Sequence, residues 1–150
     1  MASYHFHLTQ VKRSRGQSVI AQAAYRAGEK LYSTYYGESS DFTRKRGVVM
    51  AEICLPDHAP REYADRETLR NALEWAETGR KAQLAHSFHI TLMNEFSMEE
   101  NIEMARTFVR EELVSRGMIA DFAIHDPVRP KGAEPNPHIH ILVPIRPLKE

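Results

Sequence analysis

The chain has 150 residues, of which 42% are hydrophobic and 27% charged, and its formal net charge at pH 7 is zero. This composition is that of a folded domain with a hydrophobic core, and it excludes a disordered chain and a disulfide-rich module. Because Cys54 is the only cysteine and no apolar run has the length of a membrane span, we expect one cytoplasmic domain over 1–150, with no membrane insertion.

The first predicted element is a half-buried strand over 3–10, where apolar and polar residues alternate. Ser18 is a suitable N-cap for the alanine-rich helix that follows, VIAQAAYRAGEKL, which we expect over 19–31. Residues 48–55 have the composition of a second strand, which Pro56 ends. The first third of the chain therefore predicts a strand, a helix and a strand.

The middle of the chain predicts two helices around a strand. Asp65 is the expected N-cap of a helix over 66–84, and residues 86–94 alternate again as a strand. Ser97 and Glu100 have the spacing of a capping box, which predicts that the next helix begins at residue 98.

That helix is expected over 98–116, with Gly117 as its stop. A fourth strand, 119–125, is followed by a proline-rich loop and by the strand in NPHIHILVP, Asn136 to Pro144. The order of elements predicts an α+β fold, a two-layer sandwich in which helices cover one face of an antiparallel-rich sheet of about five strands.

The histidines follow the alternation of the predicted strands. If the apolar side of each strand faces the helices, six of the eight histidines lie on the opposite face. Lysine, glutamate and threonine are the commoner residues on such a face, so a metal site is the favoured interpretation, with scattered surface histidines as the alternative. The six are His5, His7, His89, His125, His138 and His140.

Three imidazoles make a first shell for a catalytic ion that keeps open positions for substrate. His138 and His140 are the firmest pair, because period-two spacing places them side by side on one strand. A hairpin would bring His125 beside them as the third ligand, and His89 is the next candidate. The first strand repeats the spacing and offers a rival pair. For each of these outer histidines, a plain role on the strand face is the favoured interpretation.

The predicted helix over 19–31 carries a tyrosine among small residues. Tyr25 lies next to Ala24, and helical spacing would place Tyr32 and Tyr36 on the same face. A tyrosine on a helix is usually a packing residue, but next to a three-histidine site it becomes a candidate nucleophile once its proton is removed.

Charge is unevenly distributed along the chain. Residues 1–46 carry eight Lys and Arg against three Asp and Glu, whereas 47–118 carry eight against thirteen. A basic N-terminal third is typical of proteins that bind an anionic polymer, and a solvated surface is the alternative.

Three stretches of the chain together resemble the MobA/MobL-type conjugative relaxases, which are HUH-type endonucleases. They are SVIAQAAYRAGEKL, DFTRKRGVVMAEICLP and FAIHDP with NPHIHILVPIRPL, and the resemblance extends through nearly the whole chain. It implies a bacterial protein that nicks one DNA strand at the transfer origin of a plasmid or mobile element. Relatives commonly continue into further domains, so the chain is expected to correspond to an N-terminal nuclease domain.

The resemblance assigns Tyr25 as the nucleophile, His138 and His140 as the HUH pair, and His125 as the third metal ligand. It implies a 5′-phosphotyrosyl intermediate, a free 3′-hydroxyl and later rejoining of the strands. Mn²⁺ or Mg²⁺ is the expected ion, and Zn²⁺ or Ni²⁺ is the alternative. Some members have acidic residues on the third strand, where this chain has Ser87 and His89, so His89 is a candidate for a supporting role or for the base.

The expected partners are single-stranded DNA at the origin, with an adjacent hairpin, and accessory proteins of the relaxosome. Two other functions remain open: a three-histidine hydrolase or oxygenase with a closed apolar pocket above the metal, and a DNA-binding remnant that does not cleave. The basic residues expected to hold the DNA backbone are Arg13, Arg15, Arg26, Arg44, Lys45 and Arg46.

Overall fold

The computed structural model describes residues 6–15, 18–77, 79, 82–127, 130–132 and 136–145. Its main sheet has five strands in the order β1-β5-β7-β6-β4, and each neighbouring pair is antiparallel. This confirms the predicted α+β class and the predicted number of strands. The strands are β1 (Phe6–Lys12), β4 (Val48–Cys54), β5 (Gln83–Thr91), β6 (Ala120–His125) and β7 (His138–Val143).

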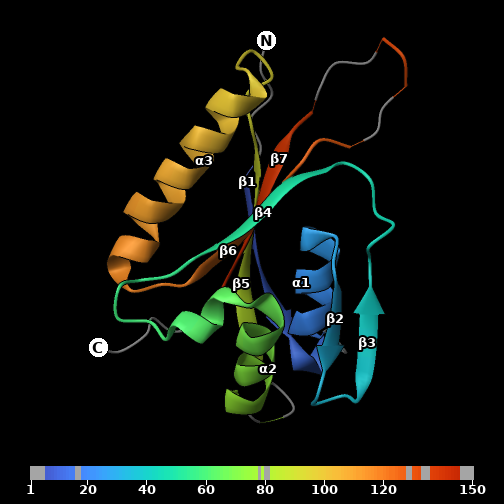
Figure 1. Cartoon of the computed structure of the whole chain (residues 1–150), viewed down its shortest axis with the longest axis vertical. Coiled ribbons are helices and arrows are strands. Elements are labelled where there is room, and N and C mark those ends of the chain that lie inside the picture. The colour runs from blue at the N-terminus through green and yellow to red at the C-terminus, as the bar shows by residue number, and fades with distance from the viewer. Residues whose placement is uncertain are drawn as a thin grey trace.

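The helices lie on both sides of this sheet (Figure 1). A hairpin of two short strands lies beside the first helix, and together with the second helix it occupies the side away from the third. Short 3-10 turns span Arg13–Arg15, Arg61–Ala64 and Val114–Arg116. The helices are α1 (Val19–Ala27), α2 (Arg66–Ala76) and α3 (Met98–Glu112), and the hairpin strands are β2 (Lys30–Ser33) and β3 (Glu38–Asp41).

One face of the sheet packs against α3 in a core of mostly apolar side chains. Ala105 and Val109 of α3 lie against Phe122 and Ile124 of β6 and against β7. On β7 this face presents Ile139, Ile141 and Val143, which are at most 2% exposed.

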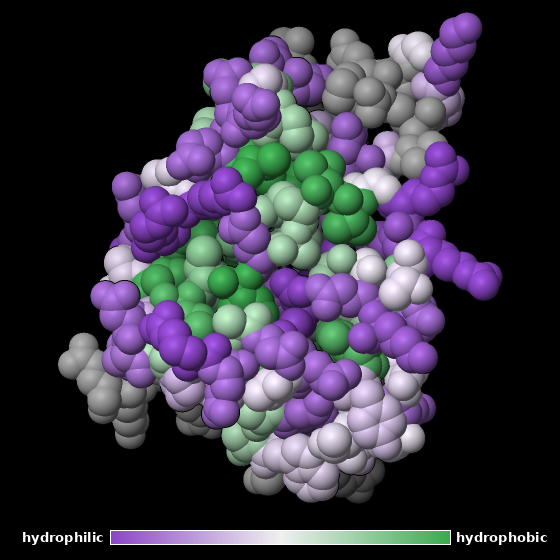
Figure 2. Space-filling model, in the orientation of Figure 1, coloured by the Kyte–Doolittle hydropathy of each residue, from purple (hydrophilic) through white to green (hydrophobic). Residues whose placement is uncertain are grey.

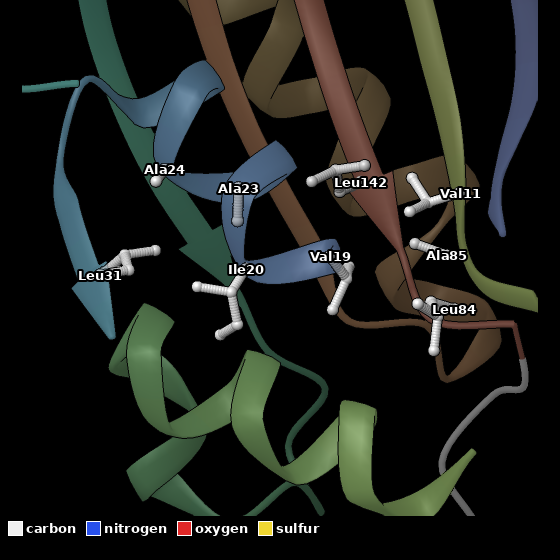
Figure 3. Packing of buried hydrophobic residues seen from close by; sticks show 9 residues of the cluster. All are labelled: Val11, Val19, Ile20, Ala23, Ala24, Leu31, Leu84, Ala85 and Leu142. Carbon is white, nitrogen blue, oxygen red and sulfur yellow. The ribbon is translucent and has the colours of Figure 1, made fainter. Parts of the chain in front are cut away.

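The other face packs against α1 (Figure 3). Val19, Ile20, Ala23 and Ala24 of α1 form one apolar cluster with Leu142 of β7 and with Val11, Leu31, Leu84 and Ala85. Since Ile141 and Leu142 are adjacent in one strand, their side chains point to opposite faces, so the two cores are separated by the sheet.

The helices therefore do not all cover one face, which differs from the predicted layering. The prediction assumed that the face with histidines was open to water. In the structure that face is divided: the end of the sheet near Leu142 is buried under α1, and the histidines occupy the other end.

All three predicted helices end earlier than expected, and the third ends at Glu112 rather than at residue 116. The first ends at Ala27, because Gly28 adopts φ +69° and its N–H bonds to the Ala24 carbonyl as a left-handed C-cap. Tyr32 is consequently on strand β2, and the predicted helix face shared with Tyr25 is wrong. The second helix ends at Ala76 rather than at residue 84.

The predicted helix starts are confirmed. The side chains of Ser18, Asp65 and Ser97 accept hydrogen bonds from backbone N–H groups of the first helical turn. Glu100 completes the capping box of α3, and Gly117 follows the 3-10 turn after α3 with φ +85°.

The surface in Figure 2 has its apolar part in the middle of the view, between α3 and α1, with hydrophilic residues around it. Val49 of the edge strand β4 is 39% exposed. Within the described ranges, no helix has the length and apolar character needed to cross a membrane.

Candidate active site

Four histidines meet on the central strand of the sheet, β7, and its two neighbours. Strand β7 lies between β5 and β6, and its register places His140 opposite His89 of β5 and His138 opposite His125 of β6. Alternation directs all four side chains to the α1 face. The predicted hairpin pairing of His125 with the final strand is therefore present, and β5 brings His89 to the same place.

The imidazole rings are close enough to form one cluster. The ring centroids of His125 and His140 are 4.3 Å apart, those of His89 and His140 are 4.5 Å apart, and those of His138 and His140 are 6.0 Å apart. His89 stacks on His140 with an interplanar angle of 19° and meets His138 edge to face at 4.9 Å. His140 therefore lies in the middle of the cluster.

Burial favours the neutral form of three of these imidazoles, those of His125, His138 and His140. It lowers the pKa of His140 to about 2, with the neighbouring His125, His89 and Arg26 as further causes. Burial also lowers the pKa of His125 to about 4, although a hydrogen bond to the Arg26 carbonyl acts in the other direction. The pKa of His138 is lowered by burial as well. The neutral imidazole is the form that binds metal ions.

The cluster fits a divalent ion in donor type and in the proximity of its rings. One ring is turned away, because Nε2 of His125 donates to the Arg26 carbonyl at 2.6 Å. As the side chains stand, no group of three or more His, Cys, Asp or Glu in the described part of the chain is arranged to hold a metal. Binding by three imidazoles would therefore require the His125 ring to use Nδ1 or to rotate.

Helix α1 presents Tyr25 beside this cluster. Tyr25 is 47% exposed, and the next residue, Arg26, provides the carbonyl that contacts His125. The Tyr25 ring packs edge to face on Phe42 with centroids 5.3 Å apart, so the phenol is held at the surface and is not turned into the core.

A loop after β3 places a cation against the same tyrosine. Lys45 Nζ is 3.3 Å from the centroid of the Tyr25 ring and donates to the Tyr25 carbonyl at 3.0 Å. Burial, followed by the charge of Arg26, lowers the pKa of Lys45 to about 8. The sequence indicated Lys45 only as one of several basic residues.

Gly47 fixes the end of this loop. Its φ is +85°, and a Cβ there would lie 2.9 Å from the Asp126 carbonyl oxygen. The Asp126 N–H donates to the Gly47 carbonyl at 2.8 Å, which ties the loop to the end of β6 next to His125. Only glycine combines this backbone conformation with such a close approach.

A buried ionic network lies under the α1 face, and it was not predicted from the sequence. Asp121 of β6 binds Arg66 at 2.9 Å and Arg70 at 3.0 Å, and these three side chains are at most 8% exposed. Arg66 also pairs with Glu29, next to the C-cap of α1. The network thus fixes α2 and the end of α1 to the sheet.

Glu74 of α2 holds the other end of α1. This fully buried carboxylate accepts hydrogen bonds from the Ser18 hydroxyl at 2.9 Å and from the Ile20 N–H at 3.1 Å. The helix that presents Tyr25 is therefore anchored at both ends by charged residues of α2.

The basic residues proposed to hold DNA fall into two groups. Arg13 is engaged in hydrogen bonds within the protein, because it donates to the Glu74 and Glu77 carbonyls at 2.7 and 2.6 Å. Arg26 donates to Ser87 of β5 at 2.9 Å, and burial and the neighbouring Arg70 lower its pKa to about 10.

The other group faces outward near Tyr25. Arg44 and Arg46 are exposed on either side of Lys45. Of the remaining candidates, the side chain of Arg15 and all of His5 lie outside the described residues. His7 pairs in register with His89, one strand farther from the centre.

Comparison with known proteins identifies the family of the chain. The MobA/MobL family matches residues 17–150. The chain is 37% identical over 146 residues to the "Probable mobilization protein MobA" of Bifidobacterium longum, and 36% identical over 160 residues to the "Conjugal transfer protein TraA" of Rhizobium radiobacter. The alignments cover 97% and 100% of this chain, but only 25% and 14% of those proteins.

A solved structure has the same fold. It belongs to work on the molecular basis of vancomycin resistance transfer in Staphylococcus aureus, and it superposes with a TM-score of 0.89 at 34% identity. The match covers 99% of this chain and 73% of that one.

Proposed function

Since the chain belongs to the MobA/MobL family, we propose that it is the DNA-nicking part of a relaxase. The observation that carries this proposal is the exposed phenol of Tyr25 next to the residue whose carbonyl contacts the histidine cluster. A nucleophile and a set of metal-ligating side chains on one accessible face are what a phosphodiester transfer requires.

In the proposed reaction, the Tyr25 oxygen attacks a backbone phosphorus of single-stranded DNA. A bond forms between this oxygen and phosphorus, the bond from phosphorus to the 3′ oxygen breaks, and the phenol loses its proton while the leaving oxygen gains one. The products are a 5′-phosphotyrosyl link and a free 3′-hydroxyl. Attack by a 3′-hydroxyl on this link reverses the step and rejoins the strand.

His125, His138 and His140 would hold the divalent ion, Mn²⁺ or Mg²⁺ in the first instance. When bound, the ion would offset the charge that develops on the phosphate oxygens. His89 stacks on His140 at 4.5 Å, and we assign it the supporting role of orienting that ring.

Lys45 is the residue of this chain best placed to assist Tyr25. Its ammonium lies over the phenol ring, where a positive charge would attract the phosphate that the phenol attacks. Arg44 and Arg46 flank it on the surface and would hold the backbone of the strand on either side.

The alternative of a small-molecule hydrolase expects an apolar pocket above the histidines. An apolar pocket of about 310 Å³ does exist, but it is lined by Ile90, Ala105, Phe108 and Ile139, on the α3 side of the sheet. It therefore does not serve the histidine cluster.

The test is incubation with labelled single strands that carry the transfer origin, with Mn²⁺ or Mg²⁺, followed by a denaturing gel. A protein-linked 5′ product should form with the wild type and be absent with Tyr25→Phe. Tyr32→Phe is the matched control, because Tyr32 is 45% exposed on the neighbouring strand, and it should retain the product. Equal product from Tyr25→Phe and wild type would refute the nucleophile assignment.

A further inference from the structure

Three exposed aromatic side chains form a second surface feature, at the turn of the β2–β3 hairpin. The rings of Tyr35 and Tyr36 meet edge to face at 4.9 Å, and those of Tyr35 and Trp75 do so at 5.0 Å. Tyr35 is 37%, Tyr36 39% and Trp75 57% exposed. We call these three residues the aromatic platform.

Polar and cation–π contacts with neighbouring residues fix the orientation of the platform rings. The Trp75 indole N–H donates to the Thr34 hydroxyl at 2.7 Å. The guanidinium carbon of Arg13 lies 4.2 Å from the centroid of the Tyr35 ring, and Arg13 is itself fixed by the carbonyls of Glu74 and Glu77. The rings are thus oriented before any ligand arrives, which reduces the entropy lost on binding.

The hairpin connects the platform to the candidate active site. Phe42, immediately after β3, packs on Tyr25, while the platform tyrosines lie in the turn at the other end of the same hairpin. A strand of four residues spans roughly 13 Å. Three to four stacked nucleotides, at about 3.4 Å each, cover the same distance.

Exposed aromatic residues also occur on α3, but in different electrostatic surroundings. Phe96 and Phe108 line a groove with Glu100, Glu103, Glu111 and Glu112. Four carboxylates would repel a phosphate backbone. The platform instead has the guanidinium group of Arg13 against the Tyr35 ring, and α2 contributes its Trp75.

We propose that the aromatic platform stacks on bases of single-stranded DNA, about four nucleotides from the phosphate attacked by Tyr25. The inference rests on the proposed function for the identity of the ligand. Single strands are bound without reading of their sequence where bases stack on exposed aromatic rings and basic side chains contact the backbone.

Trp75 is the only tryptophan of the chain, so its fluorescence reports directly on the platform. Tyr25→Phe, which leaves the strand uncut, is titrated with an unlabelled thymidine homopolymer and with an abasic strand of the same length. The proposal predicts saturable quenching by the homopolymer and none by the abasic strand. Unchanged emission with the homopolymer, or equal quenching by both strands, overturns it.

Variants separate stacking from stability. Trp75→Leu and Tyr35→Leu should each weaken binding of the homopolymer, measured by anisotropy, by about tenfold, without changing the binding of the abasic strand. Trp75→Phe should restore most of the affinity, and Phe108→Leu on α3 should have no effect. A loss of thermal stability in Trp75→Leu with wild-type affinity would show a purely structural cluster.

The two proposals fail in different ways. Formation of the phosphotyrosyl product without any quenching of Trp75 refutes the platform and leaves the nicking function intact. Base-dependent quenching by a protein that forms no product at the origin supports the platform and refutes the assignment of Tyr25.

Discussion

The two faces of the sheet differ in what they bury. The α3 face is closed by aliphatic and aromatic side chains, whereas the α1 face combines a smaller apolar core with four histidines and a buried ionic network. The contrast is sharpest on β7, where His140 and Ile141 are neighbours that point in opposite directions. One strand therefore presents an apolar side to α3 and two histidines, His138 and His140, to the α1 face.

The largest difference between the faces should appear when these two neighbours are exchanged for alanine. His140→Ala should lower nicking by about 100-fold or more, because a proposed metal ligand is lost, while much of the DNA affinity remains. Ile141→Ala should cost about 2–5 kcal/mol of unfolding free energy through the cavity it leaves. Denaturant unfolding and the gel assay measure both variants; an equal loss of stability in His140→Ala would give that histidine a structural role.

His138→Ala tests the same side of the strand and should behave like His140→Ala. If cleavage and binding fall together, the histidines support the surface that binds DNA rather than the reacting phosphate.

The ionic network on the α1 face should contribute far more to the unfolding free energy than an ion pair on the α3 face does. Asp121→Ala leaves the guanidinium group of Arg70 buried without a carboxylate and leaves Arg66 with Glu29 alone, which should cost about 3–5 kcal/mol. Glu52 of β4, which pairs with the partly exposed Arg106 of α3, is the matched site. Glu52→Ala should change the unfolding free energy much less, because water screens that pair; comparable losses would contradict the contrast.

The α1 face should also make stability depend on pH. Because burial lowers the pKa of His125 to about 4 and of His140 to about 2, the native state keeps both neutral below the ordinary value of 6.5. The unfolded chain then binds more protons, so the unfolding free energy should fall as the pH falls from about 6.5 towards 4. Thermal unfolding without added metal measures this slope, and the slope should be smaller in His140→Ala. A melting temperature that does not fall in this range would contradict it.

The smallest expected changes in unfolding free energy come from the N-caps of α1 and α3. Ser97→Ala removes an exposed cap of α3 and should cost about 1 kcal/mol. Ser18→Ala should cost more, about 1–3 kcal/mol, because it also removes a donor from the buried Glu74 carboxylate. Urea unfolding of both variants checks the order; an equal cost would mean that Glu74 does not hold α1.

Local patterns in the sequence predicted the α3 side well. Alternation gave the faces of β5, β6 and β7, and the Ser97–Glu100 spacing gave the start of α3. The predicted first helix was too long, because it continued through Gly28, which is the C-cap in the structure. The β2–β3 hairpin was therefore missed.

The α1 side depends on contacts between distant parts of the chain. Arg70 and Glu74 lie within a helix, and nothing near them in the sequence shows that Asp121, Ser18 and Ile20 are their partners. The same holds for Lys45 on Tyr25 and for Tyr35 beside Trp75. His138 and His140 were predictable because a single strand sets their relation, and no such local rule exists for the network beneath them.

The central claim is that the Tyr25 oxygen becomes covalently joined to DNA. Mass spectrometry of proteolytic peptides after reaction with an origin strand tests it most directly. The peptide that contains Tyr25 should carry the mass of the attached nucleotides, with fragmentation placing them on that residue. Attachment at Tyr32, Tyr35 or Tyr36, or DNA cleaved with no modified peptide, would contradict the account.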